Sequence, residues 1–174
     1  MCKPAQYGAA TMSRDKRRVA LHCAHMKWID IPPVWLLTAL ALSWLIGRYD
    51  PWNLSFGGPL ANLPAGLLIG GGVVLMVLAI IELRKWNTTV IPHLEAGHLV
   101  TSGIFKRSRN PIYLGDTLIL AGFILYWDAP LALPLVPVFL WVIERRFVIP
   151  EENRLRTKFR QAFHTYCQNT RRWI

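Results

Sequence analysis

Long runs of apolar residues, separated by short polar stretches, dominate the pattern of this chain. Four runs stand out: Ile31–Ile46, Leu63–Ile81, Pro111–Trp127 and Ala129–Ile143. A helix needs about 20 apolar residues to cross a ~30 Å hydrocarbon core, with some latitude for shorter segments. The pattern therefore predicts an all-α integral membrane protein with about four transmembrane helices.

The last two apolar runs lie almost end to end. Only Asp128 and the pair Ala129-Pro130 separate their uninterrupted parts. We therefore expect a tight helical hairpin over residues 111–149, with Trp127 at the membrane interface, where tryptophan is enriched.

A different periodicity follows the fourth run. Between Leu155 and Tyr166, apolar side chains recur at steps of three and four residues, and basic side chains occupy the positions between them. This pattern is typical of an amphipathic helix. We expect that helix over residues 151–167, lying along the cytoplasmic surface of the membrane.

Charge adds an orientation to these predicted helices. The net charge is +10, and all 20 lysines and arginines except Arg48 lie before the first run, between the second and third runs, or after the fourth. Positive residues concentrate in cytoplasmic loops, so this alternation predicts both termini in the cytoplasm. Basic loops that face an anionic leaflet explain the net charge without a nucleic-acid partner.

The chain divides into three parts on this interpretation. Residues 1–28 form a basic cytoplasmic arm, residues 29–83 hold the first two transmembrane helices, and residues 84–174 carry the polar clusters. The three cysteines lie in segments assigned to the reducing side of the membrane, so we expect free thiols. No metal site is predicted.

Two polar clusters lie where the predicted hairpin meets the cytoplasm. One is KRSRNPIYLGD at residues 106–116, and the other is PEE at residues 150–152. Asn110 before Pro111 is also a good helix N-cap, and two acids suit the first turn of a helix, so each cluster has a structural interpretation as well. Because a hairpin brings both clusters to one membrane face, together they predict a site for a polar, charged cofactor.

Three stretches carry a family resemblance: NTTVIPH, then HLVTSGIFKRSRNPIYLGD, then FVIPEENRLRTKFRQAFHTYCQNTRRWI. They resemble the isoprenylcysteine carboxyl methyltransferase and phospholipid methyltransferase superfamily, most closely its small bacterial members. The resemblance covers roughly residues 82–174. It implies S-adenosyl-L-methionine as cofactor, a membrane-embedded amphiphilic or small hydrophobic methyl acceptor, and a multi-pass protein of the bacterial inner membrane.

The resemblance also implies roles for particular residues. Cofactor contacts are expected from three segments: His98, Leu99, Val100 and Phe105; Asn110, Pro111, Ile112 and Tyr113; and Glu151, supported by Glu152. Arg109 and Tyr113 are expected at the reacting centre. Arg146, or its neighbour Arg145, is expected to hold an anionic headgroup or carboxylate of the acceptor.

The chain departs from the family pattern at several positions. Asn110 replaces the histidine of the eukaryotic carboxyl methyltransferases, and Phe105 stands where the family often has tyrosine. The family implies that the C-terminal helix closes over the cofactor, and Arg160 stands in that helix where glycine usually follows phenylalanine, which is expected to alter it. Asn169-Thr170 replaces the usual Val-Pro pair.

Several points stay open at the level of sequence. Asp116, an acid inside the third run, is a functional candidate by default, and the glycines of the second run favour close helix approach: Gly66, Gly70, Gly71 and Gly72. A carboxylate, a phospholipid amine and a thiol all fit as acceptor. The alternative functions are a non-catalytic membrane module and an NADPH-dependent reductase of the related sterol reductase type.

Overall fold

A computed structural model describes residues 31–50, 54, 56, 59–86 and 99–174 of the protein. All regular structure in these residues is helical: α2 (Pro32–Arg48), α3 (Pro59–Lys85), η1 (Gly103–Lys106), α4 (Pro111–Tyr126), η2 (Pro130–Ala132), α5 (Leu135–Ile143), η3 (Glu144–Val148) and α6 (Ile149–Asn169). The predicted all-α class is therefore confirmed for this part of the chain. The predicted basic arm, residues 1–28, lies outside the described residues.

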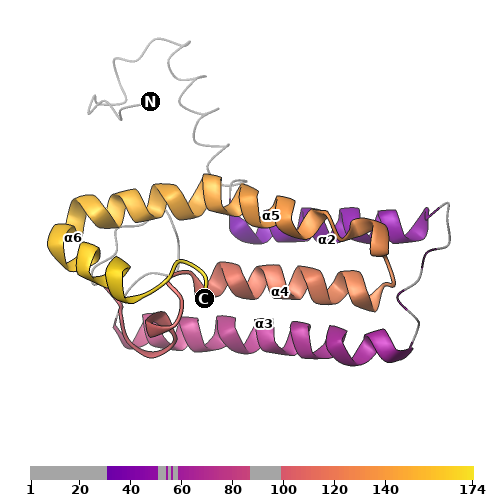
Figure 1. Ribbon diagram of the computed structural model, residues 1–174, viewed down its shortest axis with the longest axis horizontal. Helices are drawn as coiled ribbons and strands as arrows, with labels where there is room; N and C mark the ends of the chain where they lie inside the picture. Colours follow the sequence, from indigo (N-terminus) through magenta and orange to yellow (C-terminus); the bar gives the residue numbers. More distant parts are fainter. Residues whose placement is uncertain (1–30, 51–53, 55, 57–58, 87–98) are drawn as a thin grey trace, which may run out of the picture.

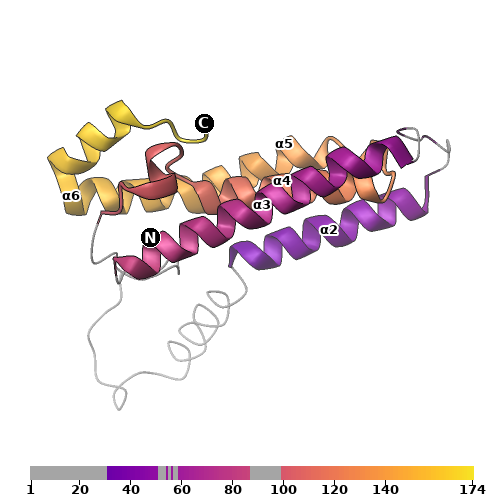
Figure 2. The same ribbon diagram turned by 90° about the horizontal axis from the view of Figure 1, so that it is seen from below.

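Helix α4 lies at the centre of the molecule. Figure 1 shows α3 packed on one side of α4, and α5 with α2 on the other side. Figure 2 shows the same helices from below, where α3 crosses over α4 at an angle. The start of α4 points toward η1, α6 and the C-terminus, so the polar clusters gather at that end of the bundle.

Small residues allow α3 and α4 to approach closely. A Cβ atom built on Gly72 would lie 2.7 Å from the carbonyl oxygen of Gly115, and one built on Gly115 would lie 2.7 Å from that of Gly72. Close approach through small residues is a common way for membrane helices to associate. The prediction holds for Gly72 alone among the four glycines of this run, because nothing lies within 4 Å of a Cβ at Gly66, Gly70 or Gly71.

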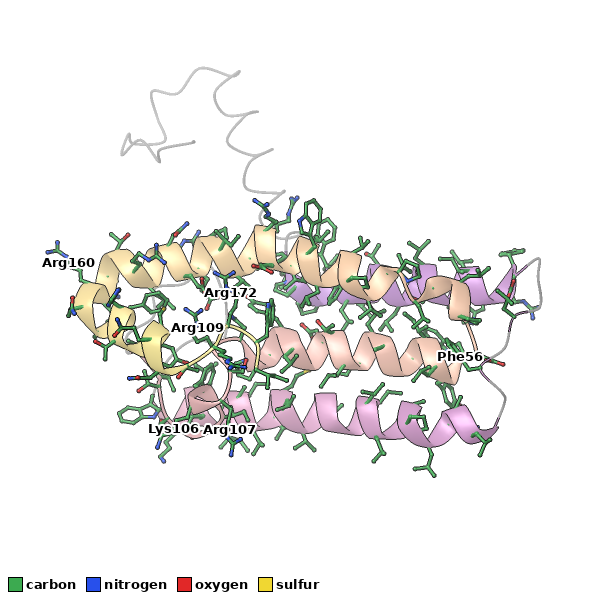
Figure 3. All side chains as sticks on the ribbon, in the orientation of Figure 1. Phe56, Lys106, Arg107, Arg109, Arg160 and Arg172 are labelled. Atoms are coloured by element: carbon green, nitrogen blue, oxygen red, sulfur yellow. The ribbon has the colours of Figure 1, made fainter. Side chains whose placement is uncertain are left out.

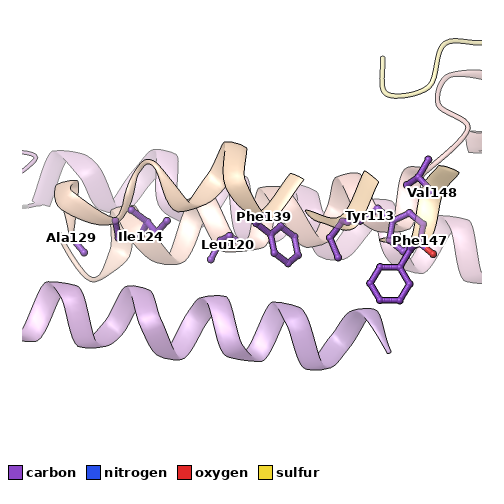
Figure 4. Packing of buried hydrophobic residues seen from close by; sticks show 9 residues of the cluster. Tyr113, Leu120, Ile124, Ala129, Phe139, Phe147 and Val148 are labelled. Carbon is purple, nitrogen blue, oxygen red and sulfur yellow. The ribbon is translucent and has the colours of Figure 1, made fainter. Parts of the chain in front are cut away.

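The opposite face of α4 carries an apolar core. Its buried members come from α4, the following turn, α5 and η3: Tyr113, Leu120, Ile124, Ala129, Ala132, Phe139, Ile143, Phe147 and Val148. Figure 4 shows Tyr113 close to Phe147 and Val148 at one end of this core. Since residues seven and eleven positions apart return to the same helix face, Tyr113, Leu120 and Ile124 form one stripe along α4.

Helices α5, η3 and α6 follow one another without a break (Figure 1). The middle piece is a π-helical turn, in which the N–H of Ile149 donates to the carbonyl of Glu144. In a regular α-helix the ring of Pro150 would crowd the carbonyl of Arg146, and the wider turn relieves that crowding. The predicted C-terminal helix therefore begins at Ile149, as an extension of α5 rather than as a separate element.

Helix α6 bends sharply at Arg160, whose backbone has φ 40° and ψ −107°. Figure 3 shows Arg160 at the outer side of this bend. A positive φ is rare outside glycine, because the Cβ atom then crowds the following backbone. The family resemblance implied glycine at this position, and the structure shows a bend that glycine would accommodate without strain.

Apolarity is consistent with a membrane location, but the number of spans stays a prediction. Among the described residues, one helix, Leu60–Lys85, is long and apolar enough to cross a membrane, and α4 is apolar but shorter. Leu37, Leu60, Leu63 and Leu67 on α2 and α3 are each more than half exposed. Such surfaces suit contact with lipid tails better than contact with water.

Candidate functional site

The hydroxyl group of Tyr113 donates a hydrogen bond to Oε2 of Glu151 across 3.1 Å. Tyr113 lies in the first turn of α4, buried, with its ring stacked against Phe147 of η3. Glu151 lies in the first turn of α6 and is half-buried. This contact joins the two predicted polar clusters through residues that lie 38 positions apart in sequence.

Glu152 accepts contacts from two arginines. Nη1 of Arg109 lies 3.4 Å from its carboxylate, while Nε and Nη2 of Arg172 donate to it across 3.2 Å and 2.7 Å. Arg172 also contacts Glu144 of η3 across 2.5 Å. The hydrogen bond to Glu152, more than any other contact, raises the pKa of Arg172 further above its ordinary value, so this guanidinium stays charged.

The C-terminal tail closes over the loop that leads into α4. The carbonyl of Arg172 accepts hydrogen bonds from Nδ2 of Asn110 (3.2 Å) and Oγ of Ser108 (3.4 Å), and the N–H of Arg109 donates to the carbonyl of Arg171 (3.1 Å). Figure 3 shows Arg109 and Arg172 next to each other between α6 and the start of α4.

A second contact fastens α6 to the loop before α4. The hydroxyl of Tyr166 donates to the carbonyl of Phe105 across 2.7 Å, and burial raises the pKa of Tyr166 well above its usual range. Tyr166 therefore remains a neutral donor at any physiological pH. The resemblance implied a closing C-terminal helix, and the structure places α6 and the tail against residues 105–110.

The side chain of Asn110 does not make the capping hydrogen bond that was expected of it. Asn110 is the residue before α4, and Pro111 is the first helical residue, as predicted. Its side chain makes no capping hydrogen bond, however, and donates instead to the tail carbonyl of Arg172. A capping bond would need Oδ1 of Asn110 to accept from the N–H of Ile112 or Tyr113, and the bond from Nδ2 to the tail holds the amide in another orientation.

Arg109 is half-buried, and one of its N–H groups has no hydrogen-bond partner in the described part of the chain. Its Nη1 contacts Glu152 and also the sulfur of Cys167, whose thiol is free. Its Nε is buried and has no hydrogen-bond partner among the described residues. A buried donor without a partner destabilises a fold, so Arg109 is a candidate ligand-binding residue.

The other residues that were expected to contact the cofactor lie on the side of the site that faces α3. Val100 and Phe105 are buried together with Ala79 of α3, and Ile112 packs against this cluster. Leu99 precedes it and is half-buried. His98 lies outside the described residues. The cluster forms an apolar wall next to the polar start of α4.

Arg146 occupies a different surface. It is exposed on η3, and its guanidinium lies 5.1 Å from the centre of the Trp35 ring on α2. A cation over an indole face is attracted by the ring quadrupole, which holds the side chain in place. The structure thus places Arg146 against α2, whereas Arg109, Tyr113 and Glu151 gather at the junction of α4 and α6.

Sequence reasoning missed two members of the ionic network, Arg172 and Glu144. The Arg-Trp ending of the tail was part of the resemblance, and it was the available signal for Arg172. Glu144 directly follows an apolar run, where an acid is expected at the membrane boundary, so the sequence gave no sign of a further role. Their roles follow only from the structure, in which the tail lies against the start of α6 and Arg172 contacts both Glu144 and Glu152.

The site can therefore hold a charged ligand by three means. The half-buried carboxylate of Glu151 can accept hydrogen bonds from a cation or from hydroxyl groups. The free Nε of Arg109 can donate to an anionic group. The wall of Val100, Phe105 and Ile112 can contact an apolar or aromatic part of the ligand.

The chain matches the model of a known protein family. The model of the phospholipid methyltransferase family matches residues 61–162, which is more than half of the chain. No curated protein and no solved structure matches the chain. The matched range begins in α3, contains all of α4 and α5, and ends in the second half of α6.

Proposed function

The chain belongs to the phospholipid methyltransferase family, and on that premise we propose that it transfers a methyl group from S-adenosylmethionine to a membrane-embedded, amphiphilic acceptor. Membership makes the protein a methyltransferase of the lipid-methylating kind. The cofactor, the residues that hold it and the acceptor are our proposal.

The observation that carries the proposal is the hydrogen bond between Tyr113 and Glu151. It draws the two polar clusters into one half-buried site that contains a carboxylate, an aromatic ring and an arginine with an unused donor. A site made only for stability would satisfy its buried polar atoms. The unpaired Nε of Arg109 supports a binding role instead.

The chemical groups of S-adenosylmethionine match the side chains of this site. Its amino group or ribose hydroxyls suit the carboxylate of Glu151, and its carboxylate suits the guanidinium of Arg109. Its adenine suits the apolar wall of Val100, Phe105 and Ile112, with His98 and Leu99 beside it in sequence. Asn110 and Pro111 shape the turn between these groups, and Glu152 supports the site by holding Arg109 in position.

When bound, the cofactor supplies a methyl group on a positively charged sulfur. Transfer of that group needs little acid–base help from the protein, so positioning and exclusion of water supply most of the rate. In our proposal Tyr113 and Arg109 orient the donor, and the tail contacts of Asn110 and Arg172 exclude water from it.

The proposal includes a location for the chain. Four transmembrane segments, with both termini in the cytoplasm of a bacterial cell and the site facing that side, agree with the distribution of lysine and arginine. Arg146, exposed at the edge of α2, is proposed to bind the anionic part of the acceptor headgroup. An Arg146→Gln variant should raise the KM for the acceptor and leave cofactor affinity unchanged.

Calorimetry with S-adenosylhomocysteine tests the proposal on protein held in nanodiscs. We expect micromolar binding to the wild type and at least tenfold weaker binding, about 1.4 kcal/mol, to Glu151→Gln and Tyr113→Ala. Asn153→Ala changes an exposed side chain of the same helix α6 and serves as the control with unchanged affinity. Absence of binding by folded wild type would contradict the proposal and favour a non-catalytic membrane module.

A further inference from the structure

Arg172 of the tail binds one carboxylate at the start of the π-helical turn and another beyond its end. Its Nη1 contacts Glu144, the first residue of η3, across 2.5 Å. Its Nε and Nη2 donate to Glu152, in the first turn of α6, across 3.2 Å and 2.7 Å. Arg172 thus links the start of the π-helical turn to the helix that follows it, in which Glu151 lies.

The direction of the Glu151 side chain depends on this turn. In η3 the N–H of Ile149 donates to the carbonyl of Glu144, five residues back rather than four. The additional residue rotates every later side chain by about 100° around the helix axis, which is one residue's share of a 3.6-residue turn. Glu151 follows Ile149 by two residues, so a regular α-helical turn here would point its carboxylate away from Tyr113, its present partner.

The start of α4 anchors the tail that carries Arg172. The carbonyl of Arg172 accepts hydrogen bonds from Nδ2 of Asn110 and Oγ of Ser108, across 3.2 Å and 3.4 Å. Trp173, the next residue of the tail, packs against the apolar core. Tyr113 belongs to that core and lies in the first turn of α4. The tail is therefore fixed to the same helix start that holds Tyr113, and its guanidinium can align α6 with that helix.

The contacts of Arg172 point to a role in geometry rather than in ligand binding. Each of its three side-chain nitrogens already contacts a carboxylate, whereas the buried Nε of Arg109 has no partner among the described residues. The side chains of Arg172 and Glu144 are 34 % and 28 % exposed, so solvent weakens what this pair contributes to stability. Its effect should therefore appear in the arrangement of the site more than in the stability of the fold.

We infer that Arg172 and Glu144 are positioning residues, which hold the π-helical turn in the shape that directs Glu151 toward Tyr113 and the cofactor. The inference rests on the proposed function, because the direction of Glu151 matters for binding only if Glu151 binds the cofactor. Both residues act through Glu151 and do not touch the cofactor themselves. A binding group must be held within about 0.5 Å of its productive position, so a small rotation of the turn is enough to weaken binding.

The test measures S-adenosylhomocysteine binding by calorimetry in nanodiscs for Glu144→Gln, Glu151→Gln and the double variant. Gln keeps the size of the Glu144 side chain and removes the charge that attracts Arg172. Arg172→Lys is a second variant, which keeps the charge of the tail but lacks the planar fork that binds two carboxylates at once. Hydrogen exchange of residues 144–152, measured without ligand, reports on the π-helical turn itself.

Asp128→Asn is the matched control. The carboxylate of Asp128 accepts a hydrogen bond from the N–H of Phe56 across 2.6 Å, so it also joins segments that are far apart in sequence. Phe56 lies at the end of the bundle opposite Arg172 (Figure 3). Asparagine tolerates the backbone of this position, where φ is 52°. The control therefore removes one negative charge and alters one long-range contact far from the site.

We expect Glu144→Gln and Arg172→Lys each to weaken S-adenosylhomocysteine binding about fivefold and to speed the exchange of residues 144–152 about threefold or more. In the Glu151→Gln background, Glu144→Gln should weaken binding by less than about twofold further, because its effect passes through Glu151. Asp128→Asn should change neither the affinity nor this exchange.

Unchanged affinity or unchanged exchange in Glu144→Gln, together with the expected loss of binding in Glu151→Gln, would overturn the inference and leave the proposed function intact. A full further loss in the double variant would overturn it as well, because Glu144 would then act independently of Glu151. An equal loss of affinity in Asp128→Asn would do the same, since it would show a general effect of stability. Failure of folded wild type to bind S-adenosylhomocysteine would remove the proposed function and the inference with it.

Discussion

Tyr113 and Glu151 meet across 3.1 Å although they belong to different helices, α4 and α6. The contact forms because the continuous α5–η3–α6 helix runs back along α4 and brings the first turn of α6 beside the first turn of α4 (Figure 1). A phenol that donates to a carboxylate fixes the direction of that carboxylate. The orientation of Glu151 toward a ligand therefore depends on Tyr113.

Removal of the Tyr113 hydroxyl should weaken cofactor binding through Glu151. We expect Tyr113→Phe to lower the affinity for S-adenosylhomocysteine by about tenfold, since a hydrogen bond to a charged group contributes roughly 1.5–3 kcal/mol. The double variant with Glu151→Gln should lose less than the sum of the two single losses. Calorimetry of the four proteins measures this coupling. Strict additivity would show that the two side chains act independently.

The carboxylate of Glu152 should be more important for stability than Arg172. Glu152→Ala leaves Arg109, whose side chain is only 14 % exposed, without its counter-ion, and breaking such a largely buried pair costs about 3 kcal/mol. Arg172 is about one third exposed, so solvent screens its contribution, and Arg172→Ala should cost about 1 kcal/mol. Thermal unfolding in detergent should show melting temperatures lowered by roughly 6–12 °C and 2–4 °C. The reverse order would contradict this account of the network.

Replacement of Arg160 by glycine should stabilise the protein. Arg160 has φ 40°, a backbone conformation that costs a non-glycine residue about 1–3 kcal/mol, and glycine adopts it freely. After allowance for the greater chain entropy of glycine, we expect a gain of about 1 kcal/mol and a melting temperature higher by a few degrees. Arg156→Gly, in the regular part of α6, is the control and should lower the melting temperature.

Alanine should have opposite effects at two adjacent glycines of α3. At Gly72 the new Cβ atom would lie 2.7 Å from the carbonyl of Gly115, and the helices would have to separate, which costs about 1–3 kcal/mol. At Gly71 nothing lies within 4 Å, so alanine should be neutral or stabilising by up to about 1 kcal/mol. Melting temperatures of Gly72→Ala and Gly71→Ala provide the comparison. Equal shifts would mean that α3 does not contact α4 through Gly72.

The sequence by itself determined the helical class and the positions of most helices. Apolar runs with at most one charged interior residue indicate buried or lipid-facing helices, and the observed starts of α2 and α4 at Pro32 and Pro111 lie at or next to the predicted boundaries. The sequence also predicted that the stretches around Arg109 and Glu151 lie at one end of the bundle, and the structure joins them through Tyr113 and Glu151. Local composition is enough for such inferences, because helix formation and hydrophobicity depend mainly on neighbouring residues.

Only the tertiary structure decided which polar groups meet. Periodicity could not show that the tail returns, that Arg172 takes the Glu152 carboxylate, or that Asn110 gives its side chain to the tail rather than to its own helix. Nor could it show that Gly72 contacts α4 while Gly71 does not. The contacts of the tail depend on the π-helical turn before Pro150 and on the bend at Arg160. A small change in helix direction at either place moves every later residue, and contacts between distant segments are set by such directions rather than by local composition.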